Sequence, residues 1–274
     1  MPASATLPLP KPPTGPAPAS APAPTTPPPS GEPAYLKYLT TSPDTQRSAV
    51  LIYGPPCTGK TTGARTFPNP ILVDFDNNTP PGTPNVIPMW SDAFVDTVVP
   101  RRGTKYPDRI QALVRILGDL AAGARAGQTI ILDSLTRLET WYNLHEEEAP
   151  KPITEKGKVD KFELFRWRFA YFTKLLTLFS ACPANLVFIC HQQQEKDDDG
   201  RPVGQLKPHL VGQSADKLPG MFPTLLQAVR RTDKDGNVEF MWRVRPGNWE
   251  PARTPKPAKV DFIPQDYKTL LNYL

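Results

Sequence analysis

The fold of this chain is decided by the stretch Ala49-Val50-Leu51-Ile52-Tyr53-Gly54-Pro55-Pro56-Cys57-Thr58-Gly59-Lys60-Thr61. An apolar run, which predicts a buried strand over 48–53, leads directly into the pattern G-x-x-x-x-G-K-[ST]. In this setting the pattern predicts a phosphate-binding loop that opens a helix. Glycines let such a loop curl so that successive backbone N–H groups face phosphate oxygens. The sequence therefore predicts nucleotide binding rather than an ordinary turn.

Each part of the pattern has an expected task. We expect the nucleotide to be bound by Gly54, Pro55, Pro56, Cys57, Thr58, Gly59, Lys60, Thr61 and Thr62. Lys60 would reach the β- and γ-phosphates, and the hydroxyl of Thr61 would be a ligand of Mg²⁺. The predicted cofactors are ATP and Mg²⁺. No base-reading motif is visible, so the pattern leaves the choice between ATP and GTP open.

Composition divides the chain unevenly. Residues 1–33 are mainly Pro, Ala, Ser and Thr, with Lys11 and Glu32 as their charged residues, which predicts a disordered Pro-rich arm. A single nucleotide-binding domain over 34–254 is the simplest use of the remaining length, followed by a tail over 255–274 with a short helix. The prolines interrupt any leader peptide and no long apolar run follows, so we expect a cytoplasmic protein without a membrane segment.

Charge and cysteine content add little. The net charge of +5 is compatible with a polyanionic partner but does not indicate one. The three cysteines, Cys57, Cys182 and Cys190, have no C-x-x-C spacing, so the sequence indicates neither a zinc site nor a disulfide framework.

Further apolar runs predict the rest of a sheet. Parallel strands are expected over 71–76, 129–134 and 185–190, and helices over 107–123 and 162–179 would cover them. Two strand-like segments over 225–231 and 238–244 are joined by an Asp-Gly turn, which predicts an antiparallel hairpin. The expected fold class is therefore α/β, with a mainly parallel sheet flanked by helices and an antiparallel C-terminal extension.

Acidic residues end two of the predicted strands. Asp133 ends the strand over 129–134 and is the expected second holder of Mg²⁺. Ser134 follows it, where many ATPases place a water-activating glutamate. The strand over 71–76 supplies Asp76 instead, which would align the attacking water. Asp74, on the same strand, would support Thr61 or the metal.

The strand over 185–190 ends in His191. A polar side chain at this position would face the γ-phosphate and report whether the nucleotide is intact. The charged segment over 195–212 behind it is expected to be a mobile, DNA-contacting loop. An ordinary hydrogen-bonded histidine at a strand end is the competing interpretation.

Taken together, these segments resemble the RecA-like ATPases, and within them the phage nucleotide-binding proteins that act in single-strand annealing and recombination. The resemblance rests on residues 54–62, 71–76, 130–134, 187–191, 207–212 and 218–222. It implies a RecA-type core, single-stranded DNA as ligand, assembly into a ring or filament, and room for a single-strand binding protein as partner. The expected location is then the cytoplasm of a bacterial host.

Carried over by position, the resemblance assigns catalytic roles to Lys60, Asp76 and His191, and metal ligation to Thr61 and Asp133. The chain departs from the RecA pattern where it has Asp76, since relatives usually carry glutamate and an aspartate reaches less far. Slow hydrolysis is therefore expected. Pro55-Pro56 is closer to the loop of AAA-type ATPases, which keeps that class open.

Basic residues late in the chain have two possible roles. Arg253 or Lys256 would be a cation that crosses a subunit interface to the γ-phosphate. Alternatively, Arg230, Arg231, Arg243 and Arg245 would contact DNA phosphates beside Trp242 and Trp249. A solvated basic face is equally compatible with the sequence.

Two other functions fit the sequence less well. A helicase loader or another motor-type ATPase would act on a protein partner, and the Asp133-Ser134 pair argues against it. A small-molecule kinase would need an Arg-rich lid, and none can be identified.

Overall fold

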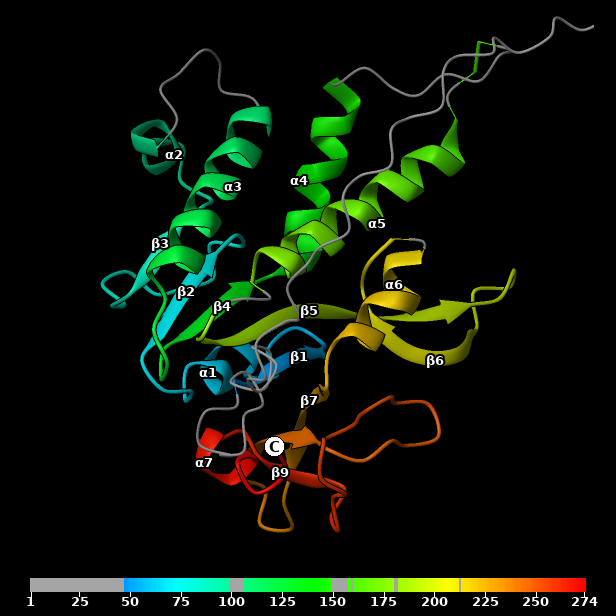
Figure 1. Cartoon of the computed structure of the whole chain (residues 1–274). Helices are drawn as coiled ribbons and strands as arrows, with labels where there is room; N and C mark the ends of the chain where they lie inside the picture. The colour runs from blue at the N-terminus through cyan, green and yellow to red at the C-terminus, as the bar shows by residue number, and fades with distance from the viewer. Residues whose placement is uncertain (1–46, 99–105, 149–156, 159, 180–181, 212) are drawn as a thin grey trace, which may run out of the picture. The chain divides into compact units, whose positions relative to one another are not determined.

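A computed structural model describes residues 47–98, 106–148, 157–158, 160–179, 182–211 and 213–274 (Figure 1). The predicted Pro-rich arm over 1–33 lies outside these residues. Within the described ranges, no helix has both the length and the apolar character that crossing a membrane requires.

One sheet organises the described part of the chain. In spatial order its strands are β3 (Val86–Pro88), β2 (Pro70–Asp74), β4 (Thr129–Asp133), β5 (Asn185–Lys196), β1 (Ala49–Gly54), β7 (Thr224–Thr232), β8 (Val238–Arg243) and β9 (Phe262–Pro264). Strands from β3 to β7 are parallel, whereas β8 pairs antiparallel with both β7 and β9. The expected α/β class, mainly parallel with an antiparallel C-terminal hairpin, is confirmed.

Helices cover both faces of this sheet (Figure 1). One face carries α2 (Asp92–Val98), α3 (Tyr106–Gly123), α4 (Leu135–Glu148), α5 (Lys161–Leu178), α6 (Gln213–Lys217) and the turn η3 (Leu218–Met221). The other carries α1 (Lys60–Ala64) and α7 (Tyr267–Leu270). Strand alternation divides the core accordingly, since Leu51 and Tyr53 pack in the first layer and Val50 and Ile52 in the second. A strand covered on both faces needs the continuous apolar run that the sequence shows.

Several elements differ from the expectation. β2 ends at Asp74, so Asp76 lies in the bend after the strand. The three-residue strands β3 and β9 are too short to leave a pattern in the sequence. α4 begins at Leu135, directly after Ser134.

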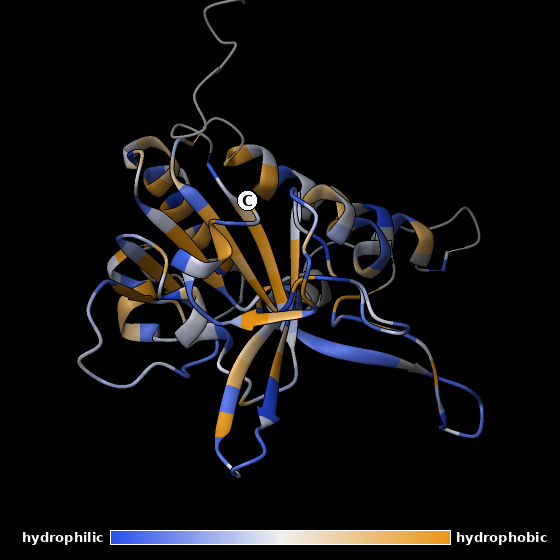
Figure 2. Cartoon of the chain, turned by 90° about the horizontal axis from the view of Figure 1, so that it is seen from below, coloured by the Kyte–Doolittle hydropathy of each residue, from blue (hydrophilic) through white to orange (hydrophobic). Residues whose placement is uncertain are grey.

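The largest difference concerns the segment expected to be a loop over 195–212. β5 continues past His191 to Lys196 and pairs antiparallel with β6 (Pro202–Pro208). Figures 1 and 2 show this hairpin extending away from the body of the sheet, with mostly hydrophilic residues. Because both of its faces are polar, the alternation that reveals a half-buried strand is missing from its sequence.

Candidate nucleotide-binding site

Two glycines allow the loop over 54–59 to form. A Cβ on Gly54 would lie 2.4 Å from the backbone oxygen of Ala228 on β7, so no larger residue fits there. Gly59 is the N-cap of α1 and has a φ of 76°, in the left-handed region that favours glycine. The loop therefore passes close to β7 and then turns its N–H groups toward the start of α1, as a phosphate site requires.

Lys60 lies folded over this loop. Its Nζ donates hydrogen bonds to the backbone oxygens of Gly54, at 3.1 Å, and Pro55, at 2.6 Å. Burial lowers the pKa of the Lys60 ammonium below its ordinary value, while the negative charges of Asp133 and Asp76 oppose that shift. The ammonium thus lies within the phosphate loop, where the charges of both carboxylates act on it.

The two predicted metal ligands meet directly. Thr61 Oγ1 donates a hydrogen bond of 2.5 Å to Asp133 Oδ2, although β5 lies between β1 and β4 in the sheet. Burial raises the pKa of Asp133 to about 6, and the nearby charges of Asp76 and Asp74 add to the effect. The Thr61 hydrogen bond opposes it. A buried carboxylate crowded by others is a site that a divalent cation would relieve, so these residues fit Mg²⁺.

Asp76 and His191 also come together, from bends and strands far apart in the chain. His191 Nε2 lies 3.7 Å from Asp76 Oδ2. Burial raises the pKa of Asp76, but the neighbouring side chains of His191 and Ser134 more than offset this and lower it below its ordinary value. Asp76 is therefore a carboxylate whose ionised form is favoured, with His191 and Ser134 nearby, at the edge of the sheet where the phosphate loop lies.

Asp74 is hydrogen-bonded to the backbone of the bend that follows β2 and not to Thr61. Its Oδ1 accepts hydrogen bonds from the backbone N–H groups of Asp76 and Asn77, at 2.9 and 3.0 Å. Its Oδ2 is buried without a hydrogen-bond partner in the described structure. Asp74 thus caps the bend that carries Asp76 and is not hydrogen-bonded to Thr61. Because β2 ends at Asp74, this carboxylate lies where it can position the bend that carries Asp76.

Sequence reasoning missed Thr136 and Glu139, at the start of α4. Thr136 Oγ1 accepts from the N–H of His191 and donates to the backbone oxygen of His209, each at 3.0 Å. The buried carboxylate of Glu139 accepts from the N–H of Val211 through both oxygens, at 3.0 and 2.8 Å. α4 therefore joins the end of β4 to His191 and to the segment that follows β6. The placement of a helix directly after Ser134 was the signal that could have revealed them.

The rear of the phosphate loop is supported by the C-terminal strands. Gln265, which follows β9, donates from Nε2 to the backbone oxygens of Thr58, at 2.9 Å, and Met241, at 3.0 Å. The ring of Phe240 lies so close to Gly59 that a Cβ there would be 3.0 Å from it. The buried Trp242 packs beside Gly63 on α1 in the same way. The loop is thus fixed from a segment about 200 residues distant in sequence.

The late basic residues have distinct environments. Arg253 donates to the backbone oxygens of Pro219 and Phe222, which braces the turn η3. Arg231 and Arg243 each lie over the ring of Phe262, 4.5 Å from its centroid. Arg243 also donates to Gln227 Oε1, which lies on β7.

Two of the remaining late basic residues lie on the surface. Arg245 pairs with Asp261 at 3.5 Å. Lys256 is exposed.

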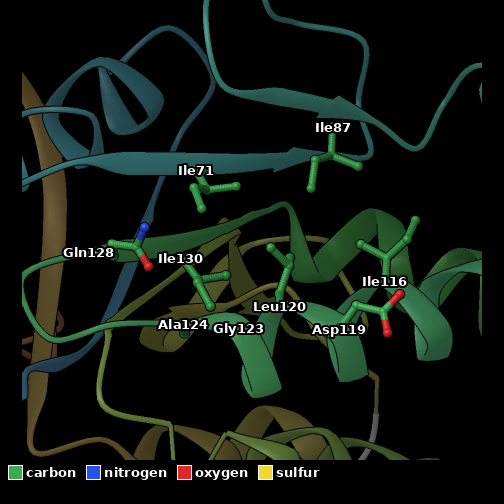
Figure 3. Close-up of a pocket in the computed structure, with 9 residues that line it drawn as sticks. All are labelled: Ile71, Ile87, Ile116, Asp119, Leu120, Gly123, Ala124, Gln128 and Ile130. Carbon is green, nitrogen blue, oxygen red and sulfur yellow. The ribbon is translucent and has the colours of Figure 1, made fainter.

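Two hollows of different character lie at opposite edges of the sheet. A pocket of about 510 Å³ borders Thr61 and Thr62 and is lined on its other side by residues of the loop over 78–84, which leaves room for a ribose and base beyond the phosphate loop. An apolar pocket of about 350 Å³ lies at the amino ends of β2 and β4, where Ile71, Ile130 and Leu120 line it (Figure 3). Ligands of parallel α/β sheets bind at the carboxyl ends of strands, so the first pocket belongs to the nucleotide site.

The phosphate loop, the Thr61–Asp133 contact and the strand order define a P-loop NTPase core of the RecA-like type. The matching family model, described as an AAA domain, spans residues 46–254, and the chain belongs to that family. Membership supports ATPase activity with bound nucleotide. A comparison with curated proteins gives no match.

Three solved structures share parts of this architecture. An ATPase from the type III secretion system of pathogenic bacteria is 12% identical over 69% of this chain and 52% of its own, with a TM-score of 0.38. The assembled ATPase EscN from enteropathogenic E. coli is 13% identical over 67% and 43%, also at 0.38. The flagellar accessory protein FlaH from Methanocaldococcus jannaschii is 10% identical over 72% and 76%, at 0.29. The chain thus spans about half the length of the first two, and likeness at this level does not define activity.

Proposed function

We propose that this protein is an ATP-dependent, single-stranded DNA binding protein that acts in phage recombination or strand annealing. Mg-ATP binds at the phosphate loop, with Lys60 on the β- and γ-phosphates and Thr61 and Asp133 on the metal. The bound Mg²⁺ supplies positive charge that neutralises the phosphates during hydrolysis. Asp76 accepts a hydrogen bond from the attacking water, and His191 holds Asp76 and senses the γ-phosphate.

The observation that carries this proposal is the continuity of β5. The strand runs without a break from its parallel register with β1 and β4, through His191, into the hairpin with β6. Thr136 fixes the backbone of His191 and of His209, one at each side of the hairpin base. A change at the γ-phosphate therefore has a direct covalent route to a projecting polar arm, which is what a ligand-stimulated ATPase needs.

The hairpin offers DNA a set of hydrogen-bonding and cationic side chains. Gln194, Lys196 and Arg201 are exposed on it. Single strands are bound by such polar and basic surfaces together with aromatic stacking. Assembly into a ring or filament, as in the RecA-like ATPases that the sequence resembles, would place the β5–β6 hairpins of several subunits along one strand of DNA.

The first experiment measures ATP hydrolysis by the purified protein with and without a single-stranded oligonucleotide, with Lys60→Ala as the blank. We expect DNA to raise the rate and Lys60→Ala to abolish it. The double variant Lys196→Glu, Arg201→Glu should lower the stimulation ratio, whereas Lys234→Glu, at the tip of the β7–β8 hairpin, is the matched control. If the ATP turnover of the wild type is the same with and without DNA, the proposed binding of single-stranded DNA is overturned.

One observation favours a second candidate, an ATPase that acts on a protein partner such as a loaded helicase. The segment from Gln192 to Pro208 has three basic residues and four acidic ones, so the hairpin carries no positive excess. A strongly cationic surface is the usual mark of nucleic-acid binding. Turnover that is stimulated by a partner protein and not by DNA would select this candidate.

A further inference from the structure

A second hollow adjoins the phosphate loop on the side away from the metal ligands. It measures about 350 Å³ and lies between residues 55–58 of the loop and the end of β7, where Gln227, Val229 and Arg230 border it. Among the residues that the structure describes, its lining contains no carboxylate, and Arg230 is the only formally charged one. The hollow is therefore an electropositive space beside the part of the loop that precedes Lys60.

The register of the sheet explains why Arg230 reaches this place. Tyr53 on β1 pairs with Gln227 on β7 in parallel, so the next three residues of β7 run beside Gly54, Pro55 and Pro56. Gly54 fits directly against the backbone of Ala228, so the two segments are in contact. β7 continues beyond β1 to Thr232 because β8 pairs with it there, and Arg230 lies opposite Phe240 in that ladder. Its backbone is therefore held rigidly.

The other arginines of this region are committed elsewhere. Arg231 and Arg243 stack on Phe262, and Arg253 braces a turn. Arg230 is exposed, and no hydrogen bond, ion pair or ring contact is found for its guanidinium among the residues that the structure describes. A cation held on a rigid strand, unengaged and facing a phosphate loop, suits an anion that arrives with the ligand.

We propose that Arg230 is a catalytic residue that contacts the γ-phosphate of the nucleotide in its own chain. This inference rests on the proposed ATPase function. In hydrolysis the water oxygen forms a bond to the γ-phosphorus and the bond from that phosphorus to the bridging oxygen breaks, leaving its electron pair on ADP. The proton released by the water passes to Asp76. Negative charge on the γ-phosphoryl oxygens is spread through this step, and the guanidinium of Arg230 stabilises it from the side opposite Asp133.

The test compares Arg230→Ala and Arg230→Lys with Arg231→Ala, the adjacent arginine on the opposite face of β7. For each, ATP turnover is measured together with the affinities for ADP and for ADP with aluminium fluoride, which imitates the transferring phosphoryl group. Arg230→Ala should lower kcat about 100-fold, the usual loss for one transition-state donor. It should weaken ADP-aluminium fluoride by a similar factor and leave ADP affinity unchanged. Arg230→Lys should recover part of the loss, and Arg231→Ala should behave as wild type.

The outcomes separate the two proposals. If the wild type neither binds nor hydrolyses ATP, the proposed function fails before any variant is compared. If the wild type is active and Arg230→Ala turns over equally fast, or weakens ADP as much as the analogue, the role of Arg230 is refuted while the ATPase stands. Recovery of activity on mixing Arg230→Ala with Lys60→Ala would also refute it, because the arginine would then act on a neighbouring chain.

Discussion

Replacing Asp133 with asparagine should stabilise the nucleotide-free protein while destroying its function. Asparagine has the same size and its amide oxygen can accept the hydrogen bond from Thr61, so packing is conserved. What the substitution removes is a buried negative charge beside two other carboxylates. Asp133 is only 7% exposed, so solvent screens this charge poorly.

The magnitude follows from the pKa. Burial raises the pKa of Asp133 from 3.8 to about 6, and each unit corresponds to 1.36 kcal/mol. Because the folded state holds the proton more tightly than the unfolded state, the contribution of Asp133 to stability is full below about pH 4 and is lost as pH rises through about 6. Near pH 8 the ionised carboxylate costs about 3 kcal/mol. Asp133→Asn should recover about that amount at pH 8 and almost none of it at pH 4.

The assay is urea unfolding of both proteins across this pH range with EDTA and without nucleotide. Mg-ATP should then stabilise the wild type and not the variant, since only the wild type retains the metal ligand. Asp233→Asn is the control, because its exposed carboxylate accepts hydrogen bonds from Asn237 and has a lowered pKa. It should give no gain. A variant at Asp133 that is less stable than wild type at pH 8, or a gain that is independent of pH, would refute the reasoning.

Three further substitutions test the supports of the site. Gly54→Ala forces a Cβ against a backbone oxygen, so it should lower the free energy of unfolding in urea by about 1–3 kcal/mol or more. It should also weaken nucleotide binding, which is measured by titration. Thr136→Val removes two hydrogen bonds and should cost about 1–3 kcal/mol and lower kcat for ATP hydrolysis; unchanged turnover would separate α4 from the sensor. Arg253→Ala should lower the melting temperature through the loss of its contacts to Pro219 and Phe222, with turnover per folded molecule unchanged. If Arg253→Ala instead lost turnover at unchanged stability, Arg253 would again be a candidate for the cation that contacts the γ-phosphate.

Local sequence patterns were sufficient to predict the elements whose functional residues directly follow an apolar strand. The apolar run before Gly54 and the loop pattern predicted β1, the loop and α1, since strand, loop and helix start follow one another directly in the sequence. The positions of β4 and of the first half of β5 were predicted because a covered strand has a long apolar signature, whereas the extension of β5 to Lys196 was not. Asp133 was therefore placed correctly beside Thr61.

Long-range contacts could not be predicted in this way. Asp76 and His191 are 115 residues apart, and their approach depends on Asp74 ending β2 early and capping the bend. The late basic residues, from Arg230 to Lys256, looked equivalent in the sequence. Their roles separate only through the aromatic ring of Phe262, the carbonyls of η3 and the register between β1 and β7.

Because the amide of Gln265 supports the phosphate loop, the loop gains this support only late in synthesis. A ribosome makes the phosphate loop well before the group that binds the backbone oxygen of Thr58, because Gln265 lies 207 residues after Thr58. A nascent or truncated chain that stops before β9 therefore exposes the rear of its phosphate loop and the face of Trp242. Such fragments should be bound by chaperones and cleaved by proteases, and they should not bind ATP.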